Sequence, residues 1–541
     1  MALRFRFRSM TSSGGHQVPL APAGLTCIVG ANNAGKSQLL RELRLAAHDN
    51  EAQGNGVVLS DVQAERPVGT EEDATLWLSE HALRWDTPPG APARYAMNLS
   101  GGGMSANEFA YWTRAEDYGD SPAYLGNIAP FFLEYVAAGT AREYVSGHVG
   151  DSGQNFALAK MRSSGELEES VSDVIRAAFA VGITVDRLDV QTALRVGEVK
   201  IEVPPLNRPS AEYRQALAAL PLIDSQGDGF RSFVGMASHF LTHDYGVWLI
   251  DEPEAFLHPG QTRILGRWLA REAIARGVQL IVATHDRDFI VGALAATHSD
   301  VSIVRLTRSE SGTHFDHLSS EDVADVWSKP QLRYSNVLQG LFHAKVVVCE
   351  GDGDCRFYSA ALESLSAERL KQSVADDVLF VPSAGKGGLS GMIDAVAKVG
   401  VETWVIADFD LLQSKRELKK VLSAVGGTWS EELDANYTLA MREANENKDP
   451  ARFKKTGLNS FLDGSALAAA RALLEELAHA RLLLVPIGEL ESFDRTLGGD
   501  KNAWIGRALE SRLHESAAVR DFVAVILDPD QETDAEVAAQ E

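Results

Sequence analysis

The segment GANNAGKS, residues 30–37, restricts the fold more than any other part of this 541-residue chain. It follows the apolar run LTCIV and precedes QLLRELRLAA, in which apolar residues recur at helical spacing. Strand, loop and helix in this order fit G-x-x-x-x-G-K-[ST], whose backbone amides surround phosphate at a helix N-terminus. Lys36 is expected to contact the β- and γ-phosphates, and Ser37 to bind Mg²⁺. The predicted nucleotide contacts are Gly30, Asn32, Asn33, Gly35, Lys36, Ser37 and Gln38.

A second segment favours a nucleotide site over the alternative of a chance glycine-rich turn. VWLIDEPE, residues 247–254, is an apolar strand that ends in Asp251 and Glu252. Asp251 can hold Mg²⁺, directly or through water, and Glu252 can orient or deprotonate the attacking water. Strands that end in two acids are common, so the assignment of a nucleotide site depends on the residues that follow. DEPEAFLHPGQ followed by LIVATHD closely resembles the ABC-type ATPase heads of chromosome-maintenance and recombination-repair ATPases.

The resemblance to ABC-type heads implies further site residues. In that family a histidine at a strand end, here His285, contacts the γ-phosphate. A signature loop completes the site of the opposite subunit, and DSQGDGFRS, residues 224–232, lies where that loop belongs. Its sequence differs from L-S-G-G-Q, the usual sequence of that loop in the family. The residues assigned to the signature loop by this resemblance are Ser225, Gly227 and Gly229. Gln63 is the candidate for the Q-loop glutamine. The resemblance implies a head that dimerises over two ATP molecules, each facing a signature-helix N-terminus.

A group of acids follows several predicted strands in the last 200 residues. VVVCEGDGDC, residues 346–355, is an apolar run that ends in Glu350 and a glycine-rich acidic turn. Asp408 and Asp410 end a later strand in WVIADFD. Because the carboxyl ends of parallel strands share one crevice, Glu350, Asp354, Asp408 and Asp410 are expected to converge as ligands for Mg²⁺ or Mn²⁺. The alternative is that these acids are helix N-caps and turn residues, the interpretation preferred for Asp352.

The order of these motifs carries a second resemblance. E-G, a glycine-marked strand and then D-x-D resemble the Toprim domain of topoisomerases, primases and certain nucleases. An ABC-type head followed by Toprim resembles the OLD (overcoming lysogenization defect) family of ATP-dependent nucleases, over nearly the whole chain. The resemblance implies a carboxylate and a lysine beyond D-x-D that complete a two-metal site. Glu491 in GELE is assigned as a ligand of the second metal. Lys501 is assigned to stabilise the pentavalent phosphate, and Lys386 and Lys455 are alternative candidates for that role.

Alternating strands and helices predict an α/β protein of two domains. The first, residues 1–335, is expected to be an ABC-type P-loop ATPase domain with an inserted, dimerisation-like region at about 66–205. The second, residues 343–541, is expected to be a Toprim domain with a helical C-terminal part. Three local predictions accompany this division. MALRFRFRSM forms an edge strand, TVDRLDV and VGEVKIEV form strands, and residues 308–342 form a connector.

The net charge of −24 weighs against a nucleic-acid-coating protein, because phosphate binding is largely electrostatic. It leaves room for an enzyme whose clustered carboxylates hold cations that face phosphate. Three cysteines, which fit no metal-ligand pattern, favour a reducing, cytoplasmic setting. The absence of an apolar run of 18 residues predicts no membrane span.

These features lead to one predicted function and several alternatives. We expect an ATP-binding and ATP-hydrolysing, metal-dependent DNA endonuclease that is gated by its head and is at least a homodimer. The OLD resemblance implies bacterial antiphage defence, with a defence-system partner protein. One alternative is an SMC-like ATP-dependent DNA-binding or sensing protein without cleavage activity. A topoisomerase- or primase-like enzyme is less favoured, since Tyr358 is poorly placed for catalysis, and a transporter cassette leaves the acidic group unexplained.

Overall fold

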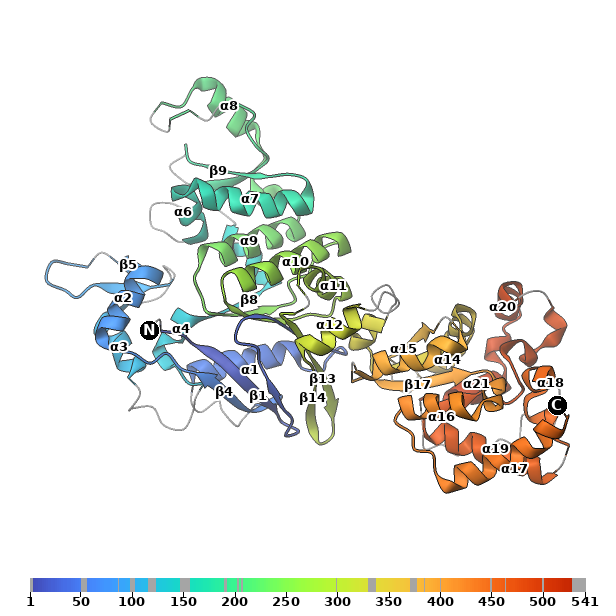
Figure 1. Cartoon of the computed structure of the whole chain (residues 1–541). Helices are drawn as coiled ribbons and strands as arrows, with labels where there is room; N and C mark the ends of the chain where they lie inside the picture. Colours follow the sequence, from blue (N-terminus) through green and yellow to red (C-terminus); the bar gives the residue numbers. More distant parts are fainter. Residues whose placement is uncertain are drawn as a thin grey trace. The chain divides into compact units, whose positions relative to one another are not determined.

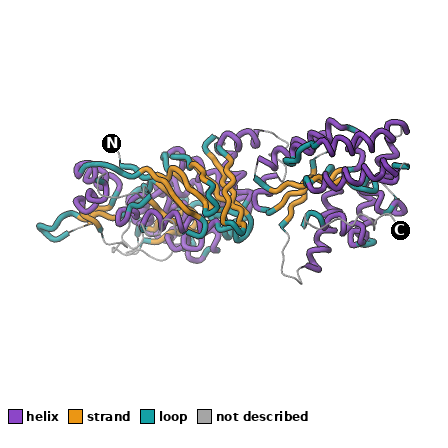
Figure 2. The backbone as a smooth tube through the Cα atoms, turned by 90° about the horizontal axis from the view of Figure 1, so that it is seen from below, coloured by secondary structure: helices purple, strands orange, loops and turns teal. Residues whose placement is uncertain are grey.

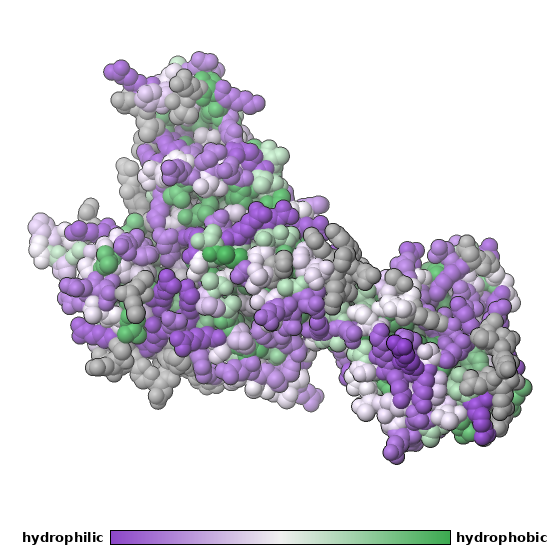
Figure 3. Space-filling view, viewed as in Figure 1, coloured by the Kyte–Doolittle hydropathy of each residue, from purple (hydrophilic) through white to green (hydrophobic). Residues whose placement is uncertain are grey.

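The computed structural model divides into two compact units, Met1–Trp327 (unit 1) and Ser328–Glu541 (unit 2). In each unit, strands are flanked by helices (Figures 1 and 2). On the face seen in Figure 3, hydrophilic side chains cover much of each unit. Among the described residues, no helix combines the length and apolar character needed to cross a membrane. The described residues are 3–49, 56–85, 87–97, 103–114, 123–145, 156–188, 192–201, 204–205, 208–297, 299–328, 337–369, 377–383, 385–398, 400–447, 450–462, 464–498 and 501–527.

A six-stranded sheet organises unit 1, in the order β14-β13-β3-β12-β11-β8. All neighbouring pairs are parallel except β13 with β14. Strands β3, β11 and β12 are buried along their whole length, as expected for parallel strands covered on both faces. The strands are β3 (Gly24–Gly30), β8 (Leu133–Ala137), β11 (Val247–Asp251), β12 (Gln279–Ala283), β13 (Val301–Ser309) and β14 (Gly312–Leu318).

Helices on the two faces of this sheet produce the burial. In Figure 1, α1 lies on one side of the strands, whereas α9, α10 and α11 lie on the other. Since β3 is flanked by strands on both sides, the glycine-rich loop that follows it leaves from the interior of the sheet. The helices are α1 (Lys36–His48), α9 (Asp228–Thr242), α10 (Pro259–Ala275) and α11 (Arg287–Ala296).

The N-terminal strand is central, so the prediction of an edge strand was wrong. β1 (Arg6–Ser12) pairs antiparallel with both β2 (Gln17–Pro19) and β4 (Leu59–Glu65) in a three-stranded sheet. Alternation of apolar and basic residues shows only that one face is buried, here through Phe7 and Met10. It carries no information about how many neighbours supply hydrogen bonds.

The region at about 66–205 contributes a strand to the main sheet, because β8 pairs in parallel with β11. GELEESVSDVIRAAFA, in which apolar residues recur at helical spacing, contains α7 (Gly165–Phe179), and TVDRLDV overlaps β9 (Ile183–Asp186). The strand predicted for VGEVKIEV was wrong in its position, because β10 (Ala193–Val196) ends where that segment begins. Gly197, with φ of 112°, ends the extended run there.

Several shorter elements complete unit 1. They are α2 (Glu71–His81), β5 (Leu83–Trp85), β6 (Arg94–Ala96), β7 (Met104–Ser105), α3 (Ala106–Thr113), η2 (Gly126–Ile128), α4 (Ala129–Phe132), α5 (Ala138–Ala141), η3 (Arg142–Val145), α6 (Phe156–Ser163), α8 (Ala211–Ala219), η4 (Ile223–Ser225) and α12 (Ser320–Ser328).

The described residues of the segment predicted as a connector, 308–328 and 337–342, form strands and helices, and the first part belongs to the sheet of unit 1 rather than to a connector. The segment contains the end of β13, the antiparallel strand β14, helix α12 and the short helix η5 (Val337–Phe342). Gly312, with φ of 123°, allows the tight reversal between β13 and β14. The hairpin extends the sheet at the β13 edge, where a half-polar strand suffices because one side faces solvent.

Unit 2 is built on a four-stranded parallel sheet in the order β16-β15-β17-β18. Trp404 of β17 is fully buried, and Phe357 of α14 packs 5.5 Å from Trp504 of α20. The elements are β15 (Lys345–Cys349), α14 (Asp352–Arg369), β16 (Val378–Pro382), α15 (Lys386–Lys398), β17 (Glu402–Ala407), η7 (Phe409–Gln413), α16 (Lys415–Ala424), α17 (Glu431–Asn447), α18 (Pro450–Thr456), η8 (Gly457–Ser460), α19 (Gly464–His479), β18 (Leu482–Leu484), η9 (Leu490–Phe493), η10 (Arg495–Leu497), α20 (Lys501–Glu510), η11 (Leu513–Glu515) and α21 (Ala517–Ala524).

A close backbone approach in unit 2 yields a stability prediction. Gly488 has φ of 118°, and a Cβ there would lie 2.4 Å from the carbonyl oxygen of Lys454. Gly488→Ala is expected to lower the free energy of unfolding of unit 2 by about 1–3 kcal/mol, since it adds backbone strain and a clash. Urea denaturation followed by tryptophan fluorescence measures the change. Gly464→Ala is the control, because a Cβ at Gly464 meets no atom within 4 Å; an equal loss in both variants would contradict the prediction.

Candidate nucleotide and metal sites

The glycine-rich loop of unit 1 encloses the Lys36 side chain. The Lys36 Nζ donates hydrogen bonds to the carbonyl oxygens of Gly30 and Ala31, each at 3.0 Å. Gly35 has φ of 100°, a conformation that glycine adopts without strain. Burial lowers the pKa of Lys36, and the nearby carboxylates of Glu252, Glu254 and Asp251 oppose this effect. The ammonium is therefore held within the loop, where phosphate oxygens can replace the carbonyls as acceptors.

Asp251 is bonded at both carboxylate oxygens. The hydroxyl of Ser37 donates to Oδ1 at 2.8 Å, and the hydroxyl of Tyr135 donates to Oδ2 at 2.9 Å. The structure thus brings together Ser37 and Asp251, the two residues expected to bind Mg²⁺ at the nucleotide. Tyr135 lies on β8, 116 positions before Asp251, and sequence reasoning missed it. No motif marks this tyrosine; only the pairing of β8 with β11 places it there.

A buried acid organises the strand end that carries His285. Glu254 is 4% exposed and accepts hydrogen bonds from the Thr284 hydroxyl at 2.7 Å and the His285 amide at 2.9 Å. The His285 Nδ1 lies 3.2 Å from Oε1 of Glu254 and 3.5 Å from Oε1 of Glu252. Burial raises the pKa of Glu254. Glu254 was also missed, although DEPE contains it; its role is to position the loop between β12 and α11.

Glu252 adopts an uncommon backbone conformation, with φ of 49°. Such left-handed residues outside glycine are rare and concentrate at functional sites. Its side chain is 46% exposed, so the carboxylate is accessible from solvent. This geometry is compatible with the predicted role of Glu252 in orienting water.

The signature-loop residues lie at the start of α9. Gly227 precedes the helix as its N-cap, and the Ser225 hydroxyl donates to the carbonyl of Leu222. A Cβ at Gly229 would lie 2.3 Å from the carbonyl oxygen of Phe256, so this turn abuts the segment after DEPE. The start of α9 is thus held beside the Glu252 strand end within the same chain.

Three other predicted nucleotide-site residues have different surroundings. Gln38 donates to Glu42 at 2.9 Å, one helical turn away, and Asn32 is exposed. Gln63 is exposed on β4 in the three-stranded sheet. Strand β8 pairs with β11 on the side away from β12, and the β8 side chain that reaches Asp251 is Tyr135 rather than a glutamine.

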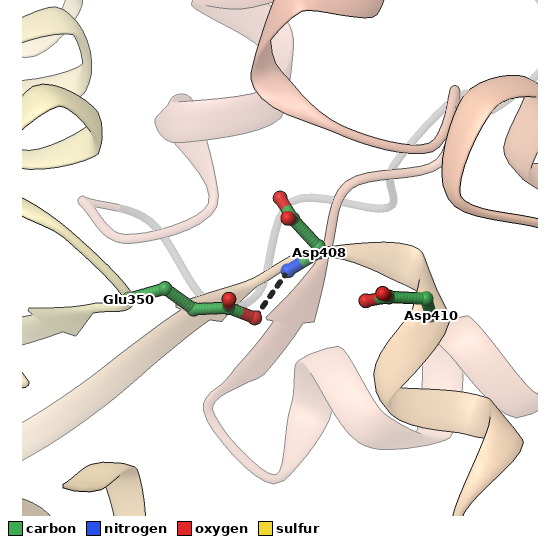
Figure 4. A group of neighbouring side chains, drawn as sticks. All are labelled: Glu350, Asp408 and Asp410. Carbon is green, nitrogen blue, oxygen red and sulfur yellow. Dashed lines mark hydrogen bonds between the residues drawn. The ribbon is translucent and has the colours of Figure 1, made fainter. Parts of the chain in front are cut away.

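Unit 2 brings three of the four predicted strand-end acids together (Figure 4). Ligand oxygens of Glu350, Asp408 and Asp410 all lie within 4.8 Å of one another. Glu350 follows β15, Asp408 follows β17, and Asp410 lies in η7. The Asp408 amide donates to Oε1 of Glu350 at 3.1 Å, which links the ends of the two paired strands. Three carboxylates at this spacing are a donor set that suits a divalent cation such as Mg²⁺ or Mn²⁺. We call these residues the three-carboxylate group.

Crowding changes the protonation of this group. Burial, followed by the neighbouring charges of Glu350 and Asp354, raises the pKa of Asp408 to about 7. Like charges at close range disfavour full ionisation, and a bound cation would reverse that effect. The three-carboxylate group is therefore electrostatically unfavourable without a counter-charge.

The fourth predicted ligand, Asp354, forms an ion pair instead of joining the three-carboxylate group. Its Oδ1 and Oδ2 lie 2.9 Å and 3.0 Å from Nζ of Lys501, and Oδ2 also accepts from the Gly351 amide. The sequence order predicted convergence at the sheet edge, but Asp354 lies in the first turn of α14, where it turns toward α20. Burial lowers the pKa of Lys501, but the Asp354 carboxylate, followed by the charges of Asp408 and Glu491, raises it above its usual value.

The remaining candidates also differ in their surroundings. Glu491 lies in η9, outside the three-carboxylate group. The backbone oxygen of Lys455 accepts from Ser492, and the neighbouring Lys454 pairs with Glu489 at 3.4 Å. The side chain of Lys386 lies outside the described atoms. Tyr358 is 1% exposed within the core of unit 2, which leaves it inaccessible to a substrate.

The glycine-rich loop around the buried Lys36, the Ser37–Asp251 contact and the parallel sheet define unit 1 as a P-loop ATPase head. Residues 212–292 match the AAA_21 family model, described as an AAA domain and linked by name to the AbiEii toxin of a Type IV TA system. The chain is 26% identical over 220 residues to the Old nuclease of Escherichia phage P2, across 39% of this chain and 35% of that protein. The chain spans about a third of the length of that relative, so these matches show similarity to an AAA domain and to part of Old nuclease.

Solved structures of ATPase heads also align with the chain. The SMC head domain from Thermotoga maritima aligns over 59% of this chain and 100% of that chain, at 13% identity and a TM-score of 0.30. The cbiO1 protein of Clostridium perfringens, part of an ABC transporter complex, aligns over 60% and 92%, at 12% identity and a TM-score of 0.30.

Removal of the Tyr135 hydroxyl tests whether its hydrogen bond to Asp251 contributes to ATP hydrolysis. Tyr135→Phe is expected to lower kcat/KM for ATP about tenfold, since a hydrogen bond to a charged group is worth roughly 1.5 kcal/mol. Phosphate release under steady-state conditions measures the effect. Tyr111→Phe, which removes an exposed hydroxyl from α3, is the control and should match wild type. Equal activity of wild type and Tyr135→Phe would refute a role for this bond.

The Asp408 carboxyl gives a pH-dependent stability prediction for the metal-free protein. Its folded pKa of about 7 lies above the ordinary 3.8, so the folded state binds more protons between these values. The free energy of unfolding in EDTA should therefore fall as pH rises through this window. Asp408→Asn is expected to be more stable than wild type at pH 8, by on the order of a few kcal/mol. The variant should also lose the thermal stabilisation by Mg²⁺.

Thermal unfolding at pH 5 and pH 8, with EDTA or Mg²⁺, measures both effects. An Mg²⁺-induced shift of equal size in wild type and Asp408→Asn would show that this carboxylate holds no metal.

Proposed function

We propose that the chain is an ATP-hydrolysing, divalent-metal-dependent DNA endonuclease, in which unit 2 is a Toprim-type domain and the ATPase head gates cleavage. The observation that carries the proposal is the convergence of Glu350, Asp408 and Asp410 at the carboxyl edge of a parallel sheet. The similarity of part of the chain to a protein named Old nuclease supports the same conclusion. Binding of ATP by unit 1 supplies the energy source for gating.

The residues of unit 2 divide the work of phosphodiester hydrolysis. Glu350, Asp408 and Asp410 would hold Mg²⁺ or Mn²⁺, and Glu491 would serve a second ion. Bound metal in such sites activates water and stabilises the leaving 3′-oxygen. Lys501, held by both oxygens of Asp354, places a positive charge next to Asp408, where charge develops on the phosphate. Asp354 acts in this scheme through Lys501.

The residues of unit 1 provide the nucleotide response. Lys36 and Ser37 would bind the phosphates and Mg²⁺ of ATP, and Glu252 with His285 would face the γ-phosphate. The start of α9 presents backbone amides at a helix N-terminus, which suits a γ-phosphate from a second copy of the chain. We therefore propose a homodimer, or a larger homo-oligomer, that closes over ATP. A role in antiphage defence, with a partner protein, is part of the same proposal.

Plasmid cleavage by the purified protein tests the proposal. Wild type is expected to nick or cut supercoiled DNA in Mg²⁺ or Mn²⁺, and Glu350→Ala or Asp408→Ala to reduce the rate by at least about a thousandfold, because an electrostatic contact in the transition state is lost. Lys36→Ala should change the response to ATP while the metal requirement stays. Gel electrophoresis of the plasmid, with and without ATP, measures cleavage by wild type, by the carboxylate variants and by Lys36→Ala.

Three outcomes distinguish the alternatives. Cleavage that persists in both Glu350→Ala and Asp408→Ala would contradict the nuclease assignment. DNA association without any strand breakage would instead favour an SMC-like sensing protein, and a covalent protein–DNA adduct would favour a topoisomerase-like enzyme.

A further inference from the structure

A second lysine stands beside the three-carboxylate group, and the nuclease mechanism above does not use it. Lys454 in α18 is 48% exposed, and its Nζ lies 3.4 Å from Oε2 of Glu489. Burial lowers its pKa, but the carboxylates of Glu489, Asp408 and Asp410 together raise it above the usual range. The ammonium is thus charged and open to solvent, and its helix α18 contacts η7, the short helix that carries Asp410.

Phe409, which stands between Asp408 and Asp410, ties Lys454 to this position. The Phe409 amide donates to the carbonyl of Gly488 at 2.8 Å, which fixes the residue before Glu489. The Phe409 ring stacks on Phe453, the residue before Lys454, with centroids 5.9 Å apart. One residue of the D-x-D turn therefore positions both partners of the Lys454–Glu489 pair.

Close backbone packing strengthens this arrangement. The Leu458 amide donates to the carbonyl of Pro486 at 2.8 Å. Gly488 approaches the carbonyl of Lys454 so closely that any side chain would collide. The end of α18 and the loop after β18 therefore behave as one rigid support for the lysine.

A purely structural role accounts poorly for this lysine. An ion pair with partners 48% and 22% exposed contributes about 0–1 kcal/mol to stability. The same arrangement recurs at Lys501, whose ammonium is held by Asp354 rather than by the three-carboxylate group. In both places, an acid that is not a member of the three-carboxylate group holds a lysine beside that group. A phosphate that approaches this many carboxylates requires such cations.

We propose that Lys454 binds a phosphate of the DNA backbone beside the three-carboxylate group, and that Glu489 holds its side chain ready for that contact. The inference rests on the proposed nuclease function and deepens it by naming a substrate contact. Lysine suits this task because its flexible stem carries a compact charge that can leave Glu489 for a phosphate oxygen.

DNA binding and cleavage by Lys454→Ala test the inference in two independent ways. In EDTA, the slope of log K against log salt for a labelled duplex should become shallower by about 0.9, the value for one phosphate contact. In Mg²⁺, kcat should fall about 10- to 100-fold, as expected on losing one charge-stabilising contact. Lys454→Arg should restore the slope. Lys420→Ala, which removes an exposed lysine from α16, is the control and should keep the wild-type kcat.

The outcomes separate this inference from the proposed function. If wild type cuts DNA and Lys454→Ala has the same slope and kcat, with an unchanged melting temperature, the inference fails alone. If wild type neither binds nor cuts DNA, both fail. A change in slope with duplex RNA but not with DNA would overturn the assignment of the substrate.

Discussion

Parallel pairing of buried strands is the constraint on which both candidate sites depend. In unit 1, the pairing of β8, β11, β12 and β3 brings four strand ends, distant in the chain, to one edge of the sheet. In unit 2, β15 and β17 do the same for Glu350 and Asp408. Each of these pairs has a continuous register of backbone partners, so the polar residues at the strand ends are held in fixed positions relative to one another.

Electrostatic crowding is the second property that the two sites share. Each places several carboxylates where water is partly excluded, and each compensates for this with buried or half-buried cations. In unit 1, Lys36 faces Asp251, Glu252 and Glu254. In unit 2, Lys501 and Lys454 stand next to acids, yet each is held by a carboxylate outside the three-carboxylate group. Under the proposed function, the three acids would hold a cation and the two lysines would supply positive charge for phosphate.

Motifs with a local cause could be predicted, whereas contacts made through strand pairing could not. The glycine-rich loop, the DEPE strand end and the D-x-D turn are each formed by consecutive residues. Each motif can therefore be recognised from a short stretch of sequence. Tyr135 has none, because its role exists only once β8 pairs with β11. Lys454 likewise resembles its neighbour Lys455 in sequence, and only the packing of Phe453 on Phe409 distinguishes them. The central position of β1 was mispredicted for the same reason, since alternation reports burial and not the number of neighbours.

By itself, the sequence determined the α/β class, the phosphate-binding loop and the strand ends that carry Glu350, Asp408 and Asp410. Hydrophobic patterning and glycine placement act over a few residues, so they can be read from short segments. Tertiary structure alone decided that Asp354 pairs with Lys501, that Tyr135 and Ser37 share Asp251, and that Glu489 holds Lys454. These contacts join residues far apart in the chain. Their geometry follows from how helices and loops pack on the sheet, which no local pattern encodes.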